Sequence, residues 1–434
     1  MSDEIIIIGS GISAAGACYH LRENGLKAAV YDKNSFPWGH TATHVYEPGY
    51  LFDEGPHVSF TSDERIQEIF AESLGGEFDS TPYVLNNYWQ GYWATHPVQN
   101  HLKGLPPEIV TTIIAEFARL SSDDVEINNY ADWLNASYGP TFAKNFPMVY
   151  TEKYHTTQAE NLTTDWIGPR MHQPDLEQVI LGAISENPPN IHYIKNFRYP
   201  KSGGFEQYLP SFFKGFDIAL NHEVVEISPA EKQVRFADGK VAAYSSLISS
   251  IPVPSLVPLI KGAPAEVVEA AKKLAWSGCV LVNIGVERAD LTDAHISYVY
   301  DEDIVFSRLS FPHNISPSCA PEGCSSVQAE IYFSEKYRPL DLSMDECIER
   351  TVADLIRCGL LHEDDVLPVK ETVVCPYANV IFDHDRAESL AIVHSYLDEI
   401  GVHYCGRYGD WDYMWTDQSF ISGERAANNA LNGA

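Results

Sequence analysis

The first forty residues alternate between apolar runs and a helical spacing of apolar positions. Residues 5–8 are an unbroken run of isoleucines, residues 14–24 have the spacing of an amphipathic helix, and residues 27–31 return to a short apolar run. A buried strand, a helix and a second buried strand in this order are typical of a βαβ unit with parallel strands. The pattern therefore predicts that the chain opens a parallel α/β domain.

Farther along the chain the pattern changes twice. Residues 62–195 have mainly helical periodicity, whereas the residues after 197 alternate between apolar and polar positions and are punctuated by glycines, which predicts strands. Alternation over residues 278–333 predicts an antiparallel sheet. A strand at 403–405 and a helix at 419–429 then return to the first domain.

We expect three interleaved parts: a nucleotide-binding domain, a mostly helical inserted domain and an antiparallel-sheet substrate domain. Their residues are 1–61, 197–275 and 376–434 for the first, 62–196 for the second and 276–375 for the third.

Length, charge and cysteine usage narrow the class of protein. A chain of 434 residues exceeds the size at which one core stops growing. The net charge of −31 argues against nucleic acid and anionic membranes as partners, because both need clustered Lys and Arg. No apolar stretch is long enough to span a bilayer, no basic signal-peptide start precedes the first strand, and the eight cysteines contain no CxxC pair. These features predict a cytoplasmic protein with reduced thiols and no metal site.

The turn after the first apolar run carries a dinucleotide-binding fingerprint, Gly-Ser-Gly-Ile-Ser-Ala over residues 9–14. Gly9 permits the tight turn, Gly11 lets backbone approach a pyrophosphate, and Ala14 keeps the helix close to the strand. The helix N-terminus then faces the pyrophosphate with its amides and its positive dipole. Asp32, eighteen residues beyond Ala14, can accept hydrogen bonds from an adenosine ribose and disfavours a 2′-phosphate. The ligand is therefore NAD or FAD.

The C-terminal end of the chain favours FAD. Residues 406–410 follow a predicted strand, and the next helix has small residues on one face. Ligands of doubly wound sheets bind at the carboxyl ends of the strands, so this segment can meet the first glycine turn across the cofactor. The predicted fold class is α/β, with a Rossmann-like FAD-binding domain of the glutathione-reductase type interleaved with a mixed helical and antiparallel-sheet substrate domain.

Five short segments carry further candidate chemistry. They are FDEGPHVSF at 52–60, HPVQN at 96–100, WIGPR at 166–170, FRYPKSGG at 197–204 and GRYGDWDY at 406–413. In this order they resemble motifs of the FAD-dependent family that contains amine oxidases, protoporphyrinogen oxidase and UDP-galactopyranose mutase. The mutase branch fits best.

The resemblance implies roles for individual residues. His57 would lie over the isoalloxazine, Arg170 would neutralise a departing diphosphate, and Tyr377 and Tyr413 would donate hydrogen bonds to the same phosphates. Gln99 would contact the nucleotide, with Asn100 beside it. The implied FAD contacts are Gly9, Gly11, Ser13, Ala14, Asp32, Gly39, Thr43, Gly55, Val224, Gly406, Asp410 and Asp417.

The chain departs from the family pattern at three positions. His40 and Ala42 stand in the segment where the family carries an arginine toward the FAD phosphates. The second diphosphate arginine is displaced by one residue to Arg288, and such a slip on a strand turns a side chain to the other face. Either Arg288 reaches the site through a bulge or Arg308 serves instead. His96 replaces a tyrosine of the nucleotide motif, which favours an unusual base or sugar.

The implied activity is interconversion of the pyranose and furanose forms of a nucleotide diphosphate sugar on reduced FAD, through a bond between flavin N5 and the sugar. Such a reaction serves polysaccharide biosynthesis and needs NAD(P)H or another reductant to prepare the flavin. The alternative is an FAD-dependent oxidase or desaturase of the amine oxidase or protoporphyrinogen oxidase type. A flavoprotein without catalytic activity is a third interpretation.

Overall fold

A computed structural model describes residues 4–120, 126–186, 188, 191–192 and 194–432. Its first unit is a five-stranded parallel sheet in the order β19-β13-β1-β2-β9. The strands are β1 (Ile5–Ile8), β2 (Ala28–Tyr31), β9 (Ile218–Ala219), β13 (Ser246–Ser249) and β19 (Val402–Tyr404). The sheet therefore joins the first strand of the chain to strands more than two hundred residues away, as a doubly wound domain requires.

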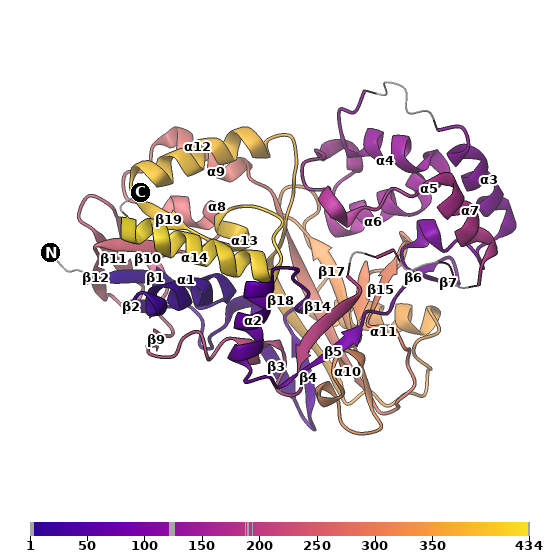
Figure 1. Cartoon of the computed structure of the whole chain (residues 1–434), viewed down its shortest axis with the longest axis horizontal. Coiled ribbons are helices and arrows are strands. Elements are labelled where there is room, and N and C mark those ends of the chain that lie inside the picture. The colour runs from indigo at the N-terminus through magenta and orange to yellow at the C-terminus, as the bar shows by residue number, and fades with distance from the viewer. Residues whose placement is uncertain (1–3, 121–125, 187, 189–190, 193, 433–434) are drawn as a thin grey trace.

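Both faces of this sheet are covered, which explains the unbroken isoleucine run. Ile5 and Ile7 pack with α1 (Ile12–Glu23) and α14 (Thr416–Asn432) on one face. Ile6 and Ile8 pack on the other face with α9 (Ala265–Lys273) and α12 (Arg386–Glu399). Figure 1 shows α1 and α14, the two ends of the chain, lying side by side. A parallel strand buried on both faces has no polar side to present.

The second unit is a seven-stranded sheet in the order β18-β14-β17-β16-β15-β6-β7. Its strands are β6 (Leu85–Trp89), β7 (Tyr92–Thr95), β14 (Trp276–Val286), β15 (Ile296–Val299), β16 (Arg308–Ser310), β17 (Ser325–Phe333) and β18 (Val369–Val380). Neighbours are antiparallel except for the β15 and β6 pair. The predicted antiparallel sheet is present, and β18 continues past residue 376.

Part of the segment predicted to be helical lies in this sheet. Residues 85–95 form the hairpin of β6 and β7, and β5 (Phe78–Pro82) pairs with β8 (Asn196–Pro200). The helical prediction was wrong there because aromatic residues pack equally well on a helix and on a pleated strand. Tyr88, for example, is buried in the core of the large sheet.

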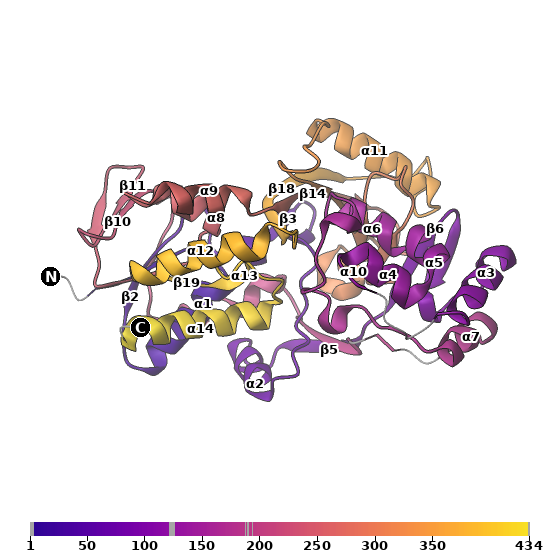
Figure 2. The ribbon, with the colours of Figure 1, turned by 90° about the horizontal axis from the view of Figure 1, so that it is seen from above.

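Helices α3 (Pro107–Phe117), α4 (Tyr130–Tyr138), α5 (Pro140–Asn145), α6 (Pro147–Tyr154) and α7 (Leu176–Ile184) form one helical group with its own apolar core. Figures 1 and 2 show this group at the end of the molecule away from the parallel sheet, with the large sheet between them. Among the described residues, no helix has the length and apolarity needed to cross a bilayer.

The remaining elements are short connections and covering helices. They are β3 (Thr43–Tyr46), β4 (Tyr50–Asp53), α2 (Glu64–Ser73), β10 (Val224–Ser228), β11 (Gln233–Phe236), β12 (Val241–Ala243), α8 (Val253–Leu256), α10 (Pro312–Ile315), α11 (Met344–Arg357) and α13 (Gly406–Gly409).

We predict that Gly423→Ala destabilises the protein, because α1 and α14 meet backbone to backbone at this position. A Cβ at Gly423 would lie 1.8 Å from the Ser13 carbonyl oxygen, so the helices must separate. Overpacking of this kind costs about 1–3 kcal/mol. The free energy of unfolding in urea measures the loss, with Asn428→Ala on the exposed face of α14 as the control. Equal unfolding curves for the two variants would show that the helices are not in close contact.

Candidate active site

The glycine turn after β1, residues 9–14, lies at the carboxyl edge of the parallel sheet and is here called the cradle. Gly9 has φ +101°, a conformation that favours glycine, and its amide donates to the Tyr31 carbonyl at 2.7 Å. Gly39, also with positive φ, lies against Gly11, since a Cβ built on Gly39 would be 3.4 Å from the Gly11 Cα. Gly11 is the N-cap of α1 and provides no side-chain cap. The first amides of α1 are therefore left for another acceptor.

Asp32 is buried and held in a fixed orientation beside this cradle. Its Oδ2 accepts from the Ser10 amide at 2.9 Å and from Ser10 Oγ at 2.7 Å, and its Oδ1 accepts from the Asn34 amide at 2.9 Å. Each carboxylate oxygen retains further acceptor capacity for a ribose hydroxyl. This donor and acceptor set fits a dinucleotide.

The C-terminal segment meets the same cradle. Gly406 has φ +79°, and a Cβ on it would be 2.7 Å from Ser13 Oγ. The Gly406 amide donates to Ser422 Oγ at 2.9 Å, and Ser422 in turn donates to Asp410. Asp410 also forms an ion pair with Arg425, so its carboxylate faces α14. The expectation that both ends of the chain reach one edge of the sheet is met by these contacts.

His40 lies in the segment where the FAD-dependent family that the motifs resemble carries an arginine toward the FAD phosphates. Burial is the main cause that lowers the pKa of His40, so the imidazole is neutral at neutral pH. Its Nδ1 lies 3.5 Å from Tyr408 Oη. His40 therefore adds no charge toward the phosphates of a dinucleotide, whereas the backbone amides and dipole at the start of α1 favour them.

The other expected FAD contacts come from several elements. Thr43 donates from Oγ1 to Asp53 at 2.6 Å, and burial raises the pKa of Asp53 to about 6. Val224 begins β10, and Asp417 lies in the first turn of α14. Gly55 lies beside His57 and accepts a hydrogen bond from its ring.

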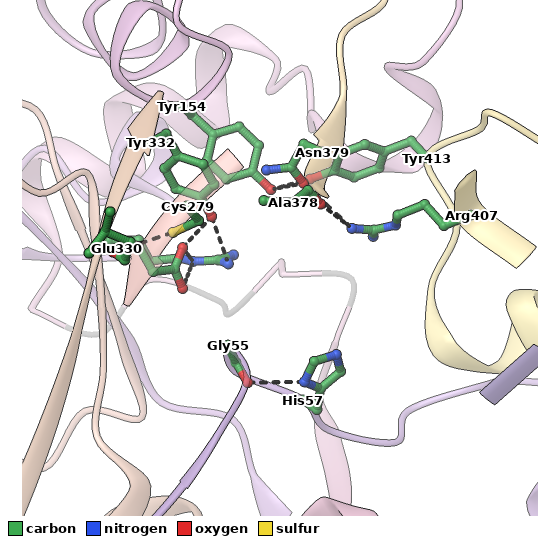
Figure 3. Close-up of polar contacts among 12 residues, drawn as sticks. Gly55, His57, Tyr154, Cys279, Glu330, Tyr332, Ala378, Asn379, Arg407 and Tyr413 are labelled. Carbon is green, nitrogen blue, oxygen red and sulfur yellow. Dashed lines mark hydrogen bonds and ion pairs between the residues drawn. The ribbon is translucent and has the colours of Figure 1, made fainter. Parts of the chain in front are cut away.

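His57 is a neutral imidazole with a defined tautomer. Its Nδ1 lies 3.0 Å from the Gly55 carbonyl oxygen, which can only accept, so Nδ1 carries the proton and Nε2 a lone pair. Burial lowers the pKa of His57 to about 4. Figure 3 shows His57 and Gly55 on one side of the view, with Tyr154, Asn379, Arg407 and Tyr413 on the other.

Arg170 lies between two aromatic rings. Its guanidinium carbon is 4.5 Å from the ring centroid of Tyr413 and 4.7 Å from that of Trp415. Its two terminal nitrogens donate to the carbonyls of Trp166 and Tyr413, while the buried Nε has no protein partner. The partners of its two terminal nitrogens are thus neutral carbonyl oxygens and not carboxylates. Arg170 therefore keeps an uncompensated charge and one free donor.

The two arginines proposed as the second diphosphate ligand, Arg288 and Arg308, have different surroundings in the structure. The side chains of Tyr154, Glu330, Tyr332, Asn379, Arg407 and Tyr413 form a cluster of aromatic and polar groups (Figure 3). Arg288 forms ion pairs with Asp290 and Asp365 near the end of β14, away from this cluster. Arg308 lies over the Tyr154 ring, with 5.7 Å from the guanidinium carbon to the centroid, so Arg308 alone is near the cluster. Its charge is cancelled, however, because Nε donates to both oxygens of the buried Glu330 at 2.9 Å.

Of the remaining expected substrate contacts, Tyr377 and Gln99 are engaged with the protein, whereas Asn100 is not. Tyr377 Oη lies 2.6 Å from Ser255 Oγ, and its ring stacks on Trp276. Gln99 donates to the His172 carbonyl at 3.2 Å. Asn100 is buried, and its Oδ1 has no protein partner.

Five residues of the cluster were given no role from the sequence: Tyr154, Glu330, Tyr332, Asn379 and Arg407, although Arg407 lies in the segment at 406–413. Strand β17 did contain a signal, since Gln328, Glu330 and Tyr332 alternate with apolar residues although the strand is buried. A carboxylate inside a buried strand indicates a charged partner. Tyr154 and Asn379 had no comparable signal.

Comparisons with known proteins agree with this architecture. A family model described as an NAD(P)-binding Rossmann-like domain matches residues 7–73. The crystal structure of a reduced UDP-galactopyranose mutase superposes with a TM-score of 0.93 at 23% identity, covering 100% of this chain and 96% of the other. The chain thus has the fold of FAD- and NAD(P)-binding Rossmann-like flavoproteins, as the motifs implied.

Two further structures share the fold at lower similarity. One is a putative protoporphyrinogen oxidase from Exiguobacterium sp. 255-15, with a TM-score of 0.76, 13% identity and full coverage of both chains. The other is a redesigned putrescine oxidase, with a TM-score of 0.66, 15% identity and coverage of 100% and 99%. The expected group of amine oxidases, protoporphyrinogen oxidase and mutase is therefore confirmed at the level of fold.

We predict that Gly11→Val prevents retention of a dinucleotide and leaves the apoprotein stable. A Cβ on Gly11 meets no protein atom closer than 3.6 Å, so the new side chain enters the cradle and not the core. The measurement is cofactor content per chain together with the thermal midpoint of cofactor-free protein. Full retention of cofactor by the variant would place the pyrophosphate elsewhere.

We also predict a pH-dependent loss of stability that involves His155. This side chain is buried between Tyr154 and Trp166, its Nδ1 has no partner, and burial lowers its pKa to about 3. A depressed folded pKa contributes stability that is complete above about 6.5 and is lost as pH falls toward about 3. Between pH 6.5 and 5 the loss is about 1–2 kcal/mol.

Replacement of the titrating group tests this prediction. His155→Gln should reduce the difference in unfolding free energy between pH 6.5 and 5, whereas His384→Gln at an exposed position should leave it unchanged. The same pH difference in the wild type and in His155→Gln would contradict the prediction.

Proposed function

We propose that this chain is an FAD-dependent enzyme that interconverts the pyranose and furanose forms of a nucleotide diphosphate sugar. The observation that carries the proposal is the state of Arg170, a cation without a carboxylate partner that lies between two aromatic rings and has a buried, free Nε. A partly buried cation that meets only neutral acceptors favours an anionic ligand. The fold of a UDP-galactopyranose mutase supports the same class of ligand.

The residues of the glycine cradle fit FAD. Gly9, Gly11 and the N-terminus of α1 would hold the pyrophosphate, and Asp32 would hold the adenosine ribose. When bound in its reduced form, this cofactor supplies an electron-rich nitrogen suited to attack at an anomeric carbon, without net oxidation. NAD(P)H or another reductant would be needed to reach that form.

The contribution of the protein is orientation and charge. Arg170 would neutralise the diphosphate as it leaves, and the rings of Tyr413 and Trp415 fix its plane before the ligand arrives. His57, neutral and with a lone pair on Nε2, would accept a hydrogen bond in the region across from Tyr413. Neither group needs to change its protonation state for these tasks.

One observation favours a second candidate, an FAD-dependent oxidase or desaturase. Glu330 cancels the charge of Arg308, so the cluster holds less positive charge than two free diphosphate ligands would give. A neutral substrate that gives up hydride would suit this weaker field.

An anaerobic assay separates the two candidates. Dithionite-reduced holoprotein and oxidised holoprotein are each incubated with a panel of UDP- and dTDP-sugars, and the ring form of the sugar is followed. Conversion by the reduced protein alone supports the mutase. Absence of conversion, combined with bleaching of the oxidised flavin by an amine or a porphyrinogen, supports the oxidase and refutes the mutase.

We predict that Arg170→Ala weakens the binding of UDP to the holoprotein by about 2–5 kcal/mol, because a desolvated charge pair is lost. The control is Arg357→Ala, which removes a surface arginine that pairs with Asp303. Isothermal titration with UDP provides the dissociation constants. An unchanged dissociation constant for Arg170→Ala would remove this residue from the diphosphate site.

A further inference from the structure

A chain of four polar side chains runs through the cluster that faces His57 (Figure 3). Tyr413 Oη and Tyr154 Oη are 2.6 Å apart, and Tyr154 Oη lies 2.9 Å from Asn379 Oδ1. Arg407 Nη1 lies 3.5 Å from the same Asn379 oxygen. The direction of each hydrogen bond in this series follows from Arg407, because its guanidinium can act only as a donor.

Arg407 is the fixed end of this series, held by two backbone carbonyls. Its Nε donates to the Met414 carbonyl at 2.8 Å and its Nη1 to the Ala378 carbonyl at 3.1 Å. The Asn379 atom that faces Nη1 must therefore be the amide oxygen, since an amide nitrogen would set two donors against each other.

The assignment of Asn379 determines both tyrosine protons. Asn379 Oδ1 accepts, so the single proton of Tyr154 is donated to it. Tyr154 then has only lone pairs left for Tyr413, and the proton of Tyr413 must point to Tyr154. The Tyr413 oxygen therefore presents lone pairs to a ligand and no proton.

We infer that Tyr413 accepts a hydrogen bond from a hydroxyl group of the sugar and does not bind the diphosphate, and that Tyr154 is the positioning residue that enforces this. The inference rests on the proposed function. A diphosphate at neutral pH offers almost only acceptor oxygens, which cannot pair with a tyrosine whose proton is already used. The expected role of Tyr413 as a phosphate donor is thereby replaced.

The packing around Tyr154 holds its side chain in place and so opposes a reversal of these hydrogen-bond directions. Tyr154 is buried and packs against Tyr150 and Tyr332, with ring centroids 5.2 and 4.7 Å away. Two residues later, Thr156 is held at φ +62°, a strained conformation for a β-branched residue, by a 2.7 Å hydrogen bond to Ser334. Strain of this kind persists only where the neighbouring contacts determine the backbone.

The hydroxyl group of a neighbouring tyrosine, Tyr332, also donates its proton within the protein. Tyr332 donates its proton to Glu330, which also neutralises Arg308. The β17 side of the cluster thus also offers an oxygen acceptor and no free cation. Polyhydroxyl groups suit this lining, and diphosphate recognition is left to Arg170.

Two probes separate sugar contacts from diphosphate contacts. Reduced holoprotein is titrated with UDP and with UDP-galactopyranose, in the wild type, Tyr413→Phe and Tyr154→Phe. We expect Tyr413→Phe to raise the dissociation constant of UDP-galactopyranose by about three- to tenfold, which corresponds to the loss of one hydrogen bond. The dissociation constant of UDP should not change. In Tyr154→Phe the hydroxyl proton of Tyr413 no longer has Tyr154 as its acceptor and can point at the ligand. We therefore expect this variant to bind UDP-galactopyranose more weakly by a similar factor and to bind UDP as tightly as the wild type or more tightly. Equal weakening of both probes by Tyr413→Phe would overturn the inference.

Failure of the proposed function would look different, because wild-type protein would then bind neither probe. The proton order can be determined without any ligand, by neutron diffraction from crystals exchanged into D2O. A deuteron of Tyr413 directed at Tyr154 Oη supports the inference in either case, and a deuteron of Tyr154 directed at Tyr413 refutes it. Asn379→Asp, which keeps an acceptor oxygen, is the matched variant and should retain the wild-type order.

Discussion

The structure depends on one close contact, the backbone-to-backbone packing of α1 against α14. A Cβ on Gly16 would lie 2.0 Å from the Phe420 carbonyl oxygen, and one on Gly423 would lie 1.8 Å from the Ser13 carbonyl oxygen. Only glycine allows helices to approach so closely. This contact brings the last helix of the chain beside the first, so that Gly406 reaches Ser13 at the edge of the parallel sheet. The cofactor cradle is therefore assembled from segments almost four hundred residues apart.

The large sheet provides the opposite side of the site with buried polar groups that are already paired. Glu330 compensates Arg308, and Asn379 orders Tyr154 and Tyr413. Pairing offsets part of the cost of burying a charge, whereas removing one partner of a buried pair costs about 3–5 kcal/mol because the other charge is left uncompensated. Arg170 and Arg407 are different, because both donate to backbone carbonyls and not to a carboxylate. Under the proposed function these cations favour an anionic ligand, although the chain as a whole carries a net charge of −31.

Much of the parallel unit could be predicted from the sequence because its signals are local. The glycine turn, the isoleucine strand and Asp32 lie within forty residues, and the fold comparison confirms the class. The hairpin of β6 and β7 could not be predicted, since its aromatic residues fit two periodicities and its partner strand β15 is about two hundred residues away. The choice between Arg288 and Arg308 depended on strand register, which only long-range pairing determines. The role of Tyr154 depends on Asn379 and Arg407, which are distant in the chain and have no shared motif.

Under the proposed function the two ends of this chain together hold one FAD. The most direct test is the identity and amount of the nucleotide released when purified protein is denatured, read by absorbance and chromatography against FAD, FMN and NAD standards. We expect FAD at about one molecule per chain, with a yellow native protein whose flavin spectrum changes on denaturation. Protein that contains no flavin and takes up none from an excess of FAD, or that retains NAD instead, would contradict it.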